Sequence, residues 1–220
     1  MSVTQRQPQA RIRGWRWLAA ALVVGAAAGS ALGLVHSGPR RATFTPSPSA
    51  ANVTWAAGAR RAPDFRLADQ HGSPISLRRF HGRPVIVTFI DPACTTLCPL
   101  EAKVLDRVAA HSPRAERPVI VAVSVNPWAQ SEATFRRDAR KWRLATAWHW
   151  AVGRYSRLAP VWKRYEIGVL VHKRVIGGHT IRDISHTEAS FLIDGAGYER
   201  ALFVYPFGAA DVAKALRHLD

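Results

Sequence analysis

The chain has 220 residues, of which 48% are hydrophobic and 21% are charged, and this composition fits one globular domain with an appendage. Two cysteines exclude a small disulfide-stapled fold and a protein with several iron–sulfur clusters. The net charge of +16 suggests nucleic-acid binding at first sight. However, residues 1–63 hold eight arginines and no acidic residue, so half of this excess belongs to the N-terminal segment. We therefore expect no nucleic-acid partner.

The N-terminal segment is predicted to attach the protein to a membrane. Residues 17–35 are nineteen consecutive uncharged residues, about the length that crosses a hydrocarbon core of roughly 30 Å. Four arginines precede them in residues 1–16, which we expect to form a basic cytoplasmic tail. A signal sequence that is removed after export is the alternative. Both interpretations predict that the domain is exported, and the favoured uncleaved anchor predicts a single-pass protein of the cell membrane with its domain on the extracytoplasmic side.

The segment after the anchor divides into a linker and a domain. Residues 36–60 are rich in Pro, Ser, Ala and Gly without an apolar period, which predicts a flexible linker. Residues 61–220 are predicted to form the exported domain.

The first half of this domain is expected to contain a parallel βαβ unit. A short strand is predicted over 62–67 and a turn over 71–74. Residues 84–90 and 118–125 are continuous β-branched runs, typical of strands that are buried on both faces. Helical spacing over 100–110 connects them, so the two strands should be parallel and the crossover right-handed.

The second half predicts further elements of a mixed α/β domain. They are a surface helix over 131–142, a short strand over 148–152, a helix over 155–165, a hairpin of strands 190–193 and 201–204, and a closing helix over 209–219. This order predicts an α/β domain with a thioredoxin-like fold.

The only two cysteines, Cys94 and Cys98, follow the strand at 84–90, at the sheet edge where α/β proteins bind ligands. The start of the next helix favours the thiolate form of both, because its N–H groups and dipole are positive there. Residues at i and i+4 of a helix have Cβ atoms about 5–6 Å apart. A disulfide needs about 3.8 Å. The pair can therefore form a redox disulfide only if the loop is distorted, but it can hold a soft metal ion with little rearrangement.

The spacing of the cysteines separates this chain from two redox families. Thioredoxin-type oxidoreductases have two residues between their cysteines, and here there are three. A peroxiredoxin has a Pro-x-x-x-Thr-x-x-Cys loop, and Pro92, Thr95 and Cys98 come one residue short of it. A metal-independent thiol–disulfide oxidoreductase or peroxidase nevertheless stays open as an alternative, as does a non-catalytic redox or copper sensor.

A histidine is predicted to complete the site. His186 lies in a predicted loop before the strand at 190–193, and in a thioredoxin-like fold that loop faces the cysteine loop. Two thiolates and one imidazole suit Cu(I), a soft ion of low coordination number. They leave tetrahedral Zn²⁺ one ligand short. His172 and His179 are secondary candidates.

The sequence resembles the Sco/SenC family over about residues 60–220. The resemblance rests on residues 63–89 (PDFRLADQHGSPISLRRFHGRPVIVTF), the Cys-x-x-x-Cys-Pro loop, the Ser-Val-Asn-Pro segment at 124–127 and the motif His-Thr-x-x-x-Phe-Leu-Ile-Asp. It implies a membrane-tethered thioredoxin-like domain that binds copper, as Cu(I) or Cu(II), through Cys94, Cys98 and His186. It also implies a role in assembly of the CuA centre of cytochrome c oxidase, as copper chaperone, thiol reductant or both. The implied partner is subunit II of that oxidase or another copper protein, and no catalytic residue is assigned.

Three positions depart from the family pattern. Asn126 stands where the family usually has Asp, Ser185 where an Asp directly precedes the histidine, and residues 91–93 (Asp-Pro-Ala) where an aromatic/Thr stretch is usual. The Asp before the histidine matters because such groups orient metal-bound imidazoles. Asp183 is the expected substitute.

Overall fold

The fold is built on a central sheet whose middle strands are the two predicted β-branched runs. The computed structural model describes residues 52–219. Its strands are β1 (Val53–Thr54), β2 (Leu67–Ala68), β3 (Pro74–Ile75), β4 (Val85–Ile90), β5 (Val119–Ser124), β6 (Trp148–Ala151), β7 (Val169–Ile176), β8 (His179–His186), β9 (Ala189–Ile193) and β10 (Glu199–Val204). The main sheet has the order β1-β10-β9-β4-β5-β6, with β4, β5 and β6 parallel and β9 antiparallel to both β4 and β10.

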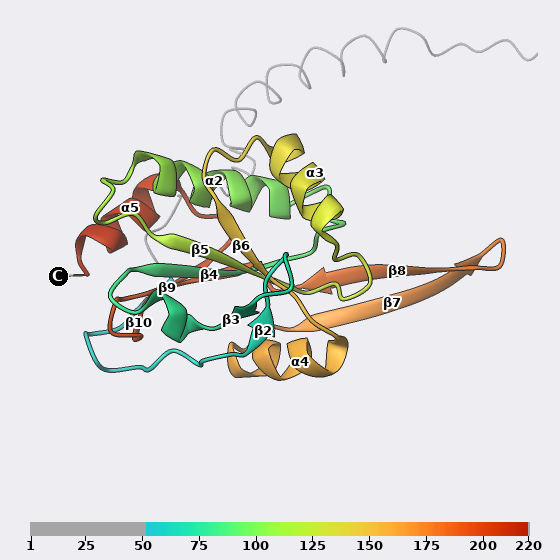
Figure 1. The fold of residues 1–220 in the computed structure, drawn as a ribbon, viewed down its shortest axis with the longest axis horizontal. Helices are drawn as coiled ribbons and strands as arrows, with labels where there is room; N and C mark the ends of the chain where they lie inside the picture. The colour runs from blue at the N-terminus through green and yellow to red at the C-terminus, as the bar shows by residue number, and fades with distance from the viewer. Residues whose placement is uncertain (1–51, 220) are drawn as a thin grey trace, which may run out of the picture. The chain divides into compact units, whose positions relative to one another are not determined.

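Helices cover both faces of this sheet. They are η1 (Leu77–Phe80), α2 (Cys98–His111), α3 (Glu132–Trp142), α4 (Tyr155–Arg164) and α5 (Ala209–Arg217). Figure 1 shows α2, α3 and α5 on one face, and α4 on the other together with the small β2–β3 hairpin.

The alternation of side chains along β4 supplies two hydrophobic cores. Ile86 and Ile90 pack in the core beneath α2, α3 and α5. Val87 and Phe89 point the other way, into the core beneath α4. All six residues of β4 and of β5 are buried, as expected of strands covered on both faces.

Most predicted elements are confirmed, with changes at their ends. The parallel β4–β5 pair, the β9–β10 hairpin and α4, which tolerates Pro160, are all present. Ser131 caps α3, since its side chain accepts a hydrogen bond from the Thr134 N–H. The strand expected over 62–67 is wrong: β2 begins only at Leu67, where antiparallel pairing with β3 becomes possible.

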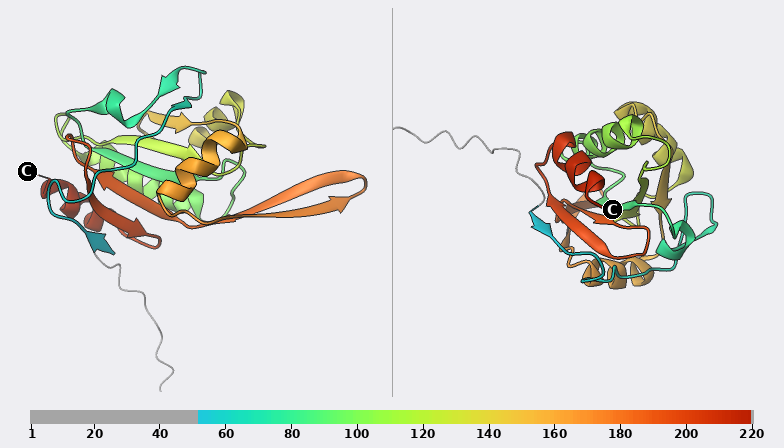
Figure 2. Two further views of the ribbon diagram at one scale, coloured as in Figure 1. Left: turned by 90° about the horizontal axis from the view of Figure 1, so that it is seen from below. Right: turned by 90° about the vertical axis from the view of Figure 1, so that its left-hand side faces the viewer.

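A long hairpin that the sequence patterns did not predict follows α4. Its strands β7 and β8 pair along their full length, from Val169 with His186 to Ile176 with His179. Figure 2 shows the hairpin extending away from the sheet, and every residue of its two strands is exposed or half-buried. Because no face of it is fully buried, its strands lack the apolar alternation by which a strand is recognised.

The predicted membrane anchor at residues 17–35 lies outside the described residues. Within residues 52–219, no helix combines the length and the apolar character that crossing a bilayer requires.

Candidate metal centre

The cysteine loop lies at the predicted place, between the carboxyl end of β4 and α2. Cys94 is half-buried in the loop, and its N–H donates to the carbonyl of Asp91 over 3.0 Å. Cys98 is the first residue of α2 and is fully buried, so the helix starts two residues earlier than the apolar spacing predicts. Pro99 occupies the first helical turn, where a missing N–H costs nothing.

The two cysteines have opposite protonation preferences. A hydrogen bond from the Cys98 thiol, helped by the N–H groups of Thr96 and Cys98, lowers the pKa of Cys94 to about 4. The same hydrogen bond, together with burial and the nearby charge of Glu188, raises the pKa of Cys98 well above its usual range. At neutral pH the metal-free site therefore holds an accessible Cys94 thiolate next to a buried Cys98 thiol, and both cysteines are free.

The structure brings His186 next to this pair. His186 is the last residue of β8 rather than part of a loop, because the hairpin continues up to it. Its Nε2 lies 3.6 Å from the Cys98 sulfur, and its side chain is only 3% exposed. The other ring nitrogen, Nδ1, lies 3.1 Å from the carbonyl of Thr187. A carbonyl only accepts, so Nδ1 carries the proton and Nε2 is left with the lone pair that a metal needs.

The expectation that Asp183 replaces the missing aspartate beside His186 is wrong. Neighbouring side chains of a strand point to opposite faces, so Asp183 and Ser185 lie on the face opposite to His186. Asp183 instead pairs with Arg174 at 2.7 Å. The Thr187 carbonyl and Glu188 are the groups that contact the imidazole.

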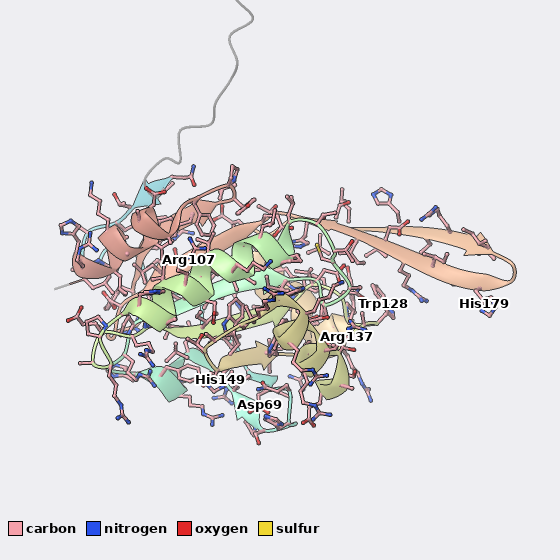
Figure 3. All side chains as sticks on the ribbon, turned by 90° about the horizontal axis from the view of Figure 1, so that it is seen from above. Asp69, Arg107, Trp128, Arg137, His149 and His179 are labelled. Carbon is pink, nitrogen blue, oxygen red and sulfur yellow. The ribbon has the colours of Figure 1, made fainter. Side chains whose placement is uncertain are left out.

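The two secondary histidine candidates stay away from the cysteines. His172 pairs in register with Asp183, on the same outward face. His179 lies at the far end of the hairpin, as Figure 3 shows. Neither belongs to the cluster around Cys98.

Two buried carboxyl groups beside the cysteines were missed by sequence reasoning. Glu188 approaches the Cys98 sulfur to 3.6 Å and His186 Nε2 to 3.3 Å. Behind it, fully buried Glu101 accepts hydrogen bonds from Thr88 (2.9 Å) and Ser190 (2.6 Å). Burial and a hydrogen bond with Glu101 raise the pKa of Glu188 to about 9. The signal available in the sequence was Glu101 itself, a carboxylate three residues after Cys98 on the apolar face of α2.

Cys94, His186 and Glu188 line an open cavity of about 410 Å³. Its lining comes from the cysteine loop and from the end of β8, and consists of Asp91, residues 93–97, residues 182–186 and Glu188. The ligand atoms of Cys94, Cys98 and Glu188 all lie within 4.8 Å of one another, which is compact enough to hold one metal ion. The arrangement can therefore bind a metal or exchange electrons through the thiols.

Comparison with known proteins decides the family. A family model described as SCO1/SenC matches residues 55–219. The chain belongs to the SCO1/SenC family. The solved structure of copper-bound ScoI from Bradyrhizobium japonicum matches with a TM-score of 0.59 and 20% identity, over 73% of this chain and 99% of that one.

A second solved structure shares the fold. The thioredoxin domain of a thiol-disulfide oxidoreductase from Bacteroides vulgatus matches with a TM-score of 0.52 and 18% identity, over 75% of this chain and 96% of that one. These structural matches confirm the predicted thioredoxin-like α/β fold. Chloroplastic peroxiredoxin Q from Oryza sativa subsp. japonica is 38% identical in an alignment of length 73 that covers 26% of this chain and 34% of that one. The chain spans about a third of the length of the curated relatives that it matches.

Two departures from the SCO1/SenC pattern contact each other. The buried amide of Asn126 donates to Asp91 Oδ1 over 2.9 Å, and the Ala93 N–H donates to the same oxygen over 2.8 Å. Burial raises the pKa of Asp91, and these two hydrogen bonds lower it. An aspartate at 126 would place a second carboxylate against the first. The amide at 126 therefore compensates for the unusual acid at 91.

This compensation predicts the effect of restoring the family residue. Asn126→Asp is expected to destabilise the protein by about 1–3 kcal/mol at pH 7, because it replaces a buried hydrogen bond by two facing carboxylates. The thermal midpoint should fall by about 2–12 °C. The double variant Asp91→Asn with Asn126→Asp restores a carboxylate–amide pair and should recover most of this loss. A single variant as stable as wild type in a thermal melt would show that the contact is unimportant.

Proposed function

We propose that the protein is a membrane-tethered, extracytoplasmic copper-binding protein that delivers copper, reducing equivalents or both during assembly of the CuA centre of cytochrome c oxidase. The observation that carries this proposal is that Cys98 Sγ lies 3.6 Å from His186 Nε2 and within 4.8 Å of the Cys94 sulfur. Membership of the SCO1/SenC family and the copper in its Bradyrhizobium japonicum relative support it. The proposed acceptor is subunit II of the oxidase or another copper protein.

The donor set suits copper as a cargo that must be both held and released. Two sulfurs and an imidazole are ligands that Cu(I) prefers. Cys98 and the His186 ring are buried and would hold the ion, while half-buried Cys94 is open to the cavity. An acceptor thiolate could therefore replace Cys94 first, and the ion would pass from one set of ligands to the other without leaving protein ligands.

Reduction of a target disulfide is the second candidate function, and the accessible Cys94 thiolate favours it. Cys94 would attack one sulfur of the target disulfide, forming a mixed disulfide and releasing the other sulfur as a thiolate. Cys98, after losing its proton, would then attack the Cys94 sulfur and release the second target thiolate. The target disulfide gains two electrons, and Cys94 and Cys98 end as a disulfide. The Bacteroides vulgatus thioredoxin domain supports this reading at the level of the fold.

A single substitution separates the two candidates. His186→Ala removes an imidazole that would bind metal but takes no part in sulfur exchange. We expect this variant to lose most copper transfer to a purified CuA-site domain, while reducing the oxidised form of that domain at near wild-type rate. Transfer is measured by the CuA absorption and reduction by the count of free thiols. Unchanged copper transfer together with lost reduction would contradict the metal-binding role given to His186. Wild-type protein that reduces the domain but transfers no copper to it would reject the chaperone and leave the oxidoreductase.

The membrane location is proposed on the sequence alone. The arginines in residues 1–16 precede the uncharged stretch at 17–35, and positive charge stays on the cytoplasmic side. The cysteines would then work in an oxidising compartment, where a supply of electrons or of Cu(I) keeps them reduced.

A further inference from the structure

The site offers four donors rather than the three that the sequence motifs indicate. Besides the two cysteines and His186, the Glu188 carboxylate lies with one oxygen 3.6 Å from the Cys98 sulfur and 3.3 Å from His186 Nε2. Its other oxygen lies 4.0 Å from the same sulfur. The carboxylate therefore occupies the position of a ligand in the cluster.

We propose that Glu188 is a fourth ligand and that the site consequently also binds a divalent ion of the Zn²⁺ type, in addition to Cu(I). This inference rests on the proposed function only in using the same two cysteines and histidine. Two sulfurs, one imidazole nitrogen and one carboxylate oxygen make the closed four-donor set that tetrahedral Zn²⁺ takes. The three-donor set alone leaves that ion one ligand short.

The backbone places Glu188 on the side of His186. His186 ends β8, and β9 begins at Ala189, so the chain is close to extended over these residues. Side chains two residues apart in an extended segment point the same way. The cysteine loop faces both, because β4 and β9 are neighbours in the sheet.

The surroundings of Glu188 resemble those of a metal-binding carboxylate that is shielded from solvent. Its side chain is only 13% exposed, and Glu101, held by Thr88 and Ser190, lies behind it. Carboxylates that bind metals are commonly held in place by hydrogen bonds to neighbouring groups that do not bind the metal themselves. Among the described residues no lysine or arginine forms an ion pair with Glu188. A cation in the cluster would supply the missing positive charge.

The charge balance favours a divalent ion. Two thiolates already outweigh the single positive charge of Cu(I), so adding a carboxylate increases a buried negative excess. A divalent ion accommodates the carboxylate with less excess, and oxygen ligands suit harder ions than Cu(I). Glu188 should therefore matter much more for Zn²⁺ than for Cu(I).

Competition titrations of the reduced full-length protein with Zn²⁺ and, separately, with Cu(I) test this assignment. Glu188→Ala is expected to weaken Zn²⁺ binding by about tenfold or more and to change Cu(I) binding by less than about threefold. Glu188→Gln, which keeps the shape but loses the charge, should behave in the same direction. Glu116→Ala, at an exposed glutamate far along the chain, is the matched control and should change neither. Co²⁺ serves as a coloured probe, since four-coordinate Co²⁺ absorbs visible light strongly and the Glu188→Ala band should shift and weaken.

Each outcome bears on a different claim. Wild-type protein that binds Cu(I) but not Zn²⁺ overturns this inference and leaves the proposed function standing. Protein that binds Zn²⁺ through Glu188 but not Cu(I) supports the inference and rejects the copper proposal. If Glu188→Ala weakens Zn²⁺ and Cu(I) binding equally, Glu188 is a positioning residue. If it weakens neither, Glu188 has no part in metal binding. Both results overturn the inference. Failure to bind either metal overturns the inference and the copper part of the proposed function.

Discussion

Reduced protein saturated with Cu(I) is expected to melt about 8–16 °C higher than metal-free reduced protein. A ligand that binds only the folded state adds about 4 kcal/mol at a thousandfold excess over Kd. For a domain of this size, each kcal/mol moves the thermal midpoint by roughly 2–4 °C. The physical cause is that the fold brings His186 next to Cys98 and Cys98 close to Cys94, whereas His186 is far from both cysteines in the unfolded chain. The measurement is a thermal melt under anaerobic conditions.

Two controls test whether Cu(I) raises the melting point by binding to the two thiolates and His186. Protein with an oxidised Cys94–Cys98 pair has no thiolate to offer, so Cu(I) should hardly change its melting. His186→Ala should lose much of the gain while both cysteines remain reduced. An equal shift in the oxidised and reduced protein would place the copper at another site and contradict the account.

The second large effect is on how the free energy of unfolding of the metal-free protein changes with pH. Between pH 5.5 and 7.5, the Cys94–Glu188 pair should make the free energy of unfolding of wild-type protein change little with pH. Glu188→Gln should instead gain stability relative to wild type by roughly 1.4 kcal/mol for each unit by which the pH rises. The pKa of Cys94 is lowered to about 4, so the stability it contributes is present at high pH and is lost as pH falls towards 4. The pKa of Glu188 is raised to about 9, so its contribution is present at low pH and is lost as pH rises towards 9.

These two contributions cancel because folding moves a proton from one group to the other. In the unfolded chain at pH 6.5 the thiol is protonated and the carboxyl is ionised. In the fold the Cys94 thiolate is charged and Glu188 is neutral, so the number of bound protons is the same. Glu188→Gln removes one side of the exchange. Urea unfolding of both proteins at pH 5.5, 6.5 and 7.5 measures the difference, and parallel curves would show that the two groups are not perturbed in this way.

The elements that position the site could be predicted because their sequence patterns are strong and local. The buried runs of β4 and β5 contain almost only apolar residues, and the helix after Pro99 has clear spacing. Cys94 and Cys98 follow a buried strand directly, so their place at the sheet edge needed no knowledge of the rest of the chain. His186 required the topology as well, because it comes to the cysteines from 88 residues further along the chain.

The remaining parts of the site could not be predicted because they depend on contacts distant in the chain. Glu188 belongs to the site only because the antiparallel pairing of β4 with β9 places it beside Cys98. The role of Asn126 depends on its contact with Asp91, which lies 35 residues earlier in the chain. Of the β7–β8 hairpin only Val169 and Ile184 pack against a core, so its strands have no apolar pattern from which they could be predicted. The alternation of side chains along β8 places Asp183 on the face opposite to His186.

Anaerobic titration of the reduced protein with Cu(I), with bound metal and free thiols counted together, tests the central claim most directly. We expect one tightly bound Cu(I) per chain, with both cysteines protected from thiol reagents once it is bound. Cys94→Ala and Cys98→Ala should each abolish the tight site. Protein with two free thiols that retains no Cu(I) against a competing chelator, or that retains it equally well without either cysteine, would contradict the account.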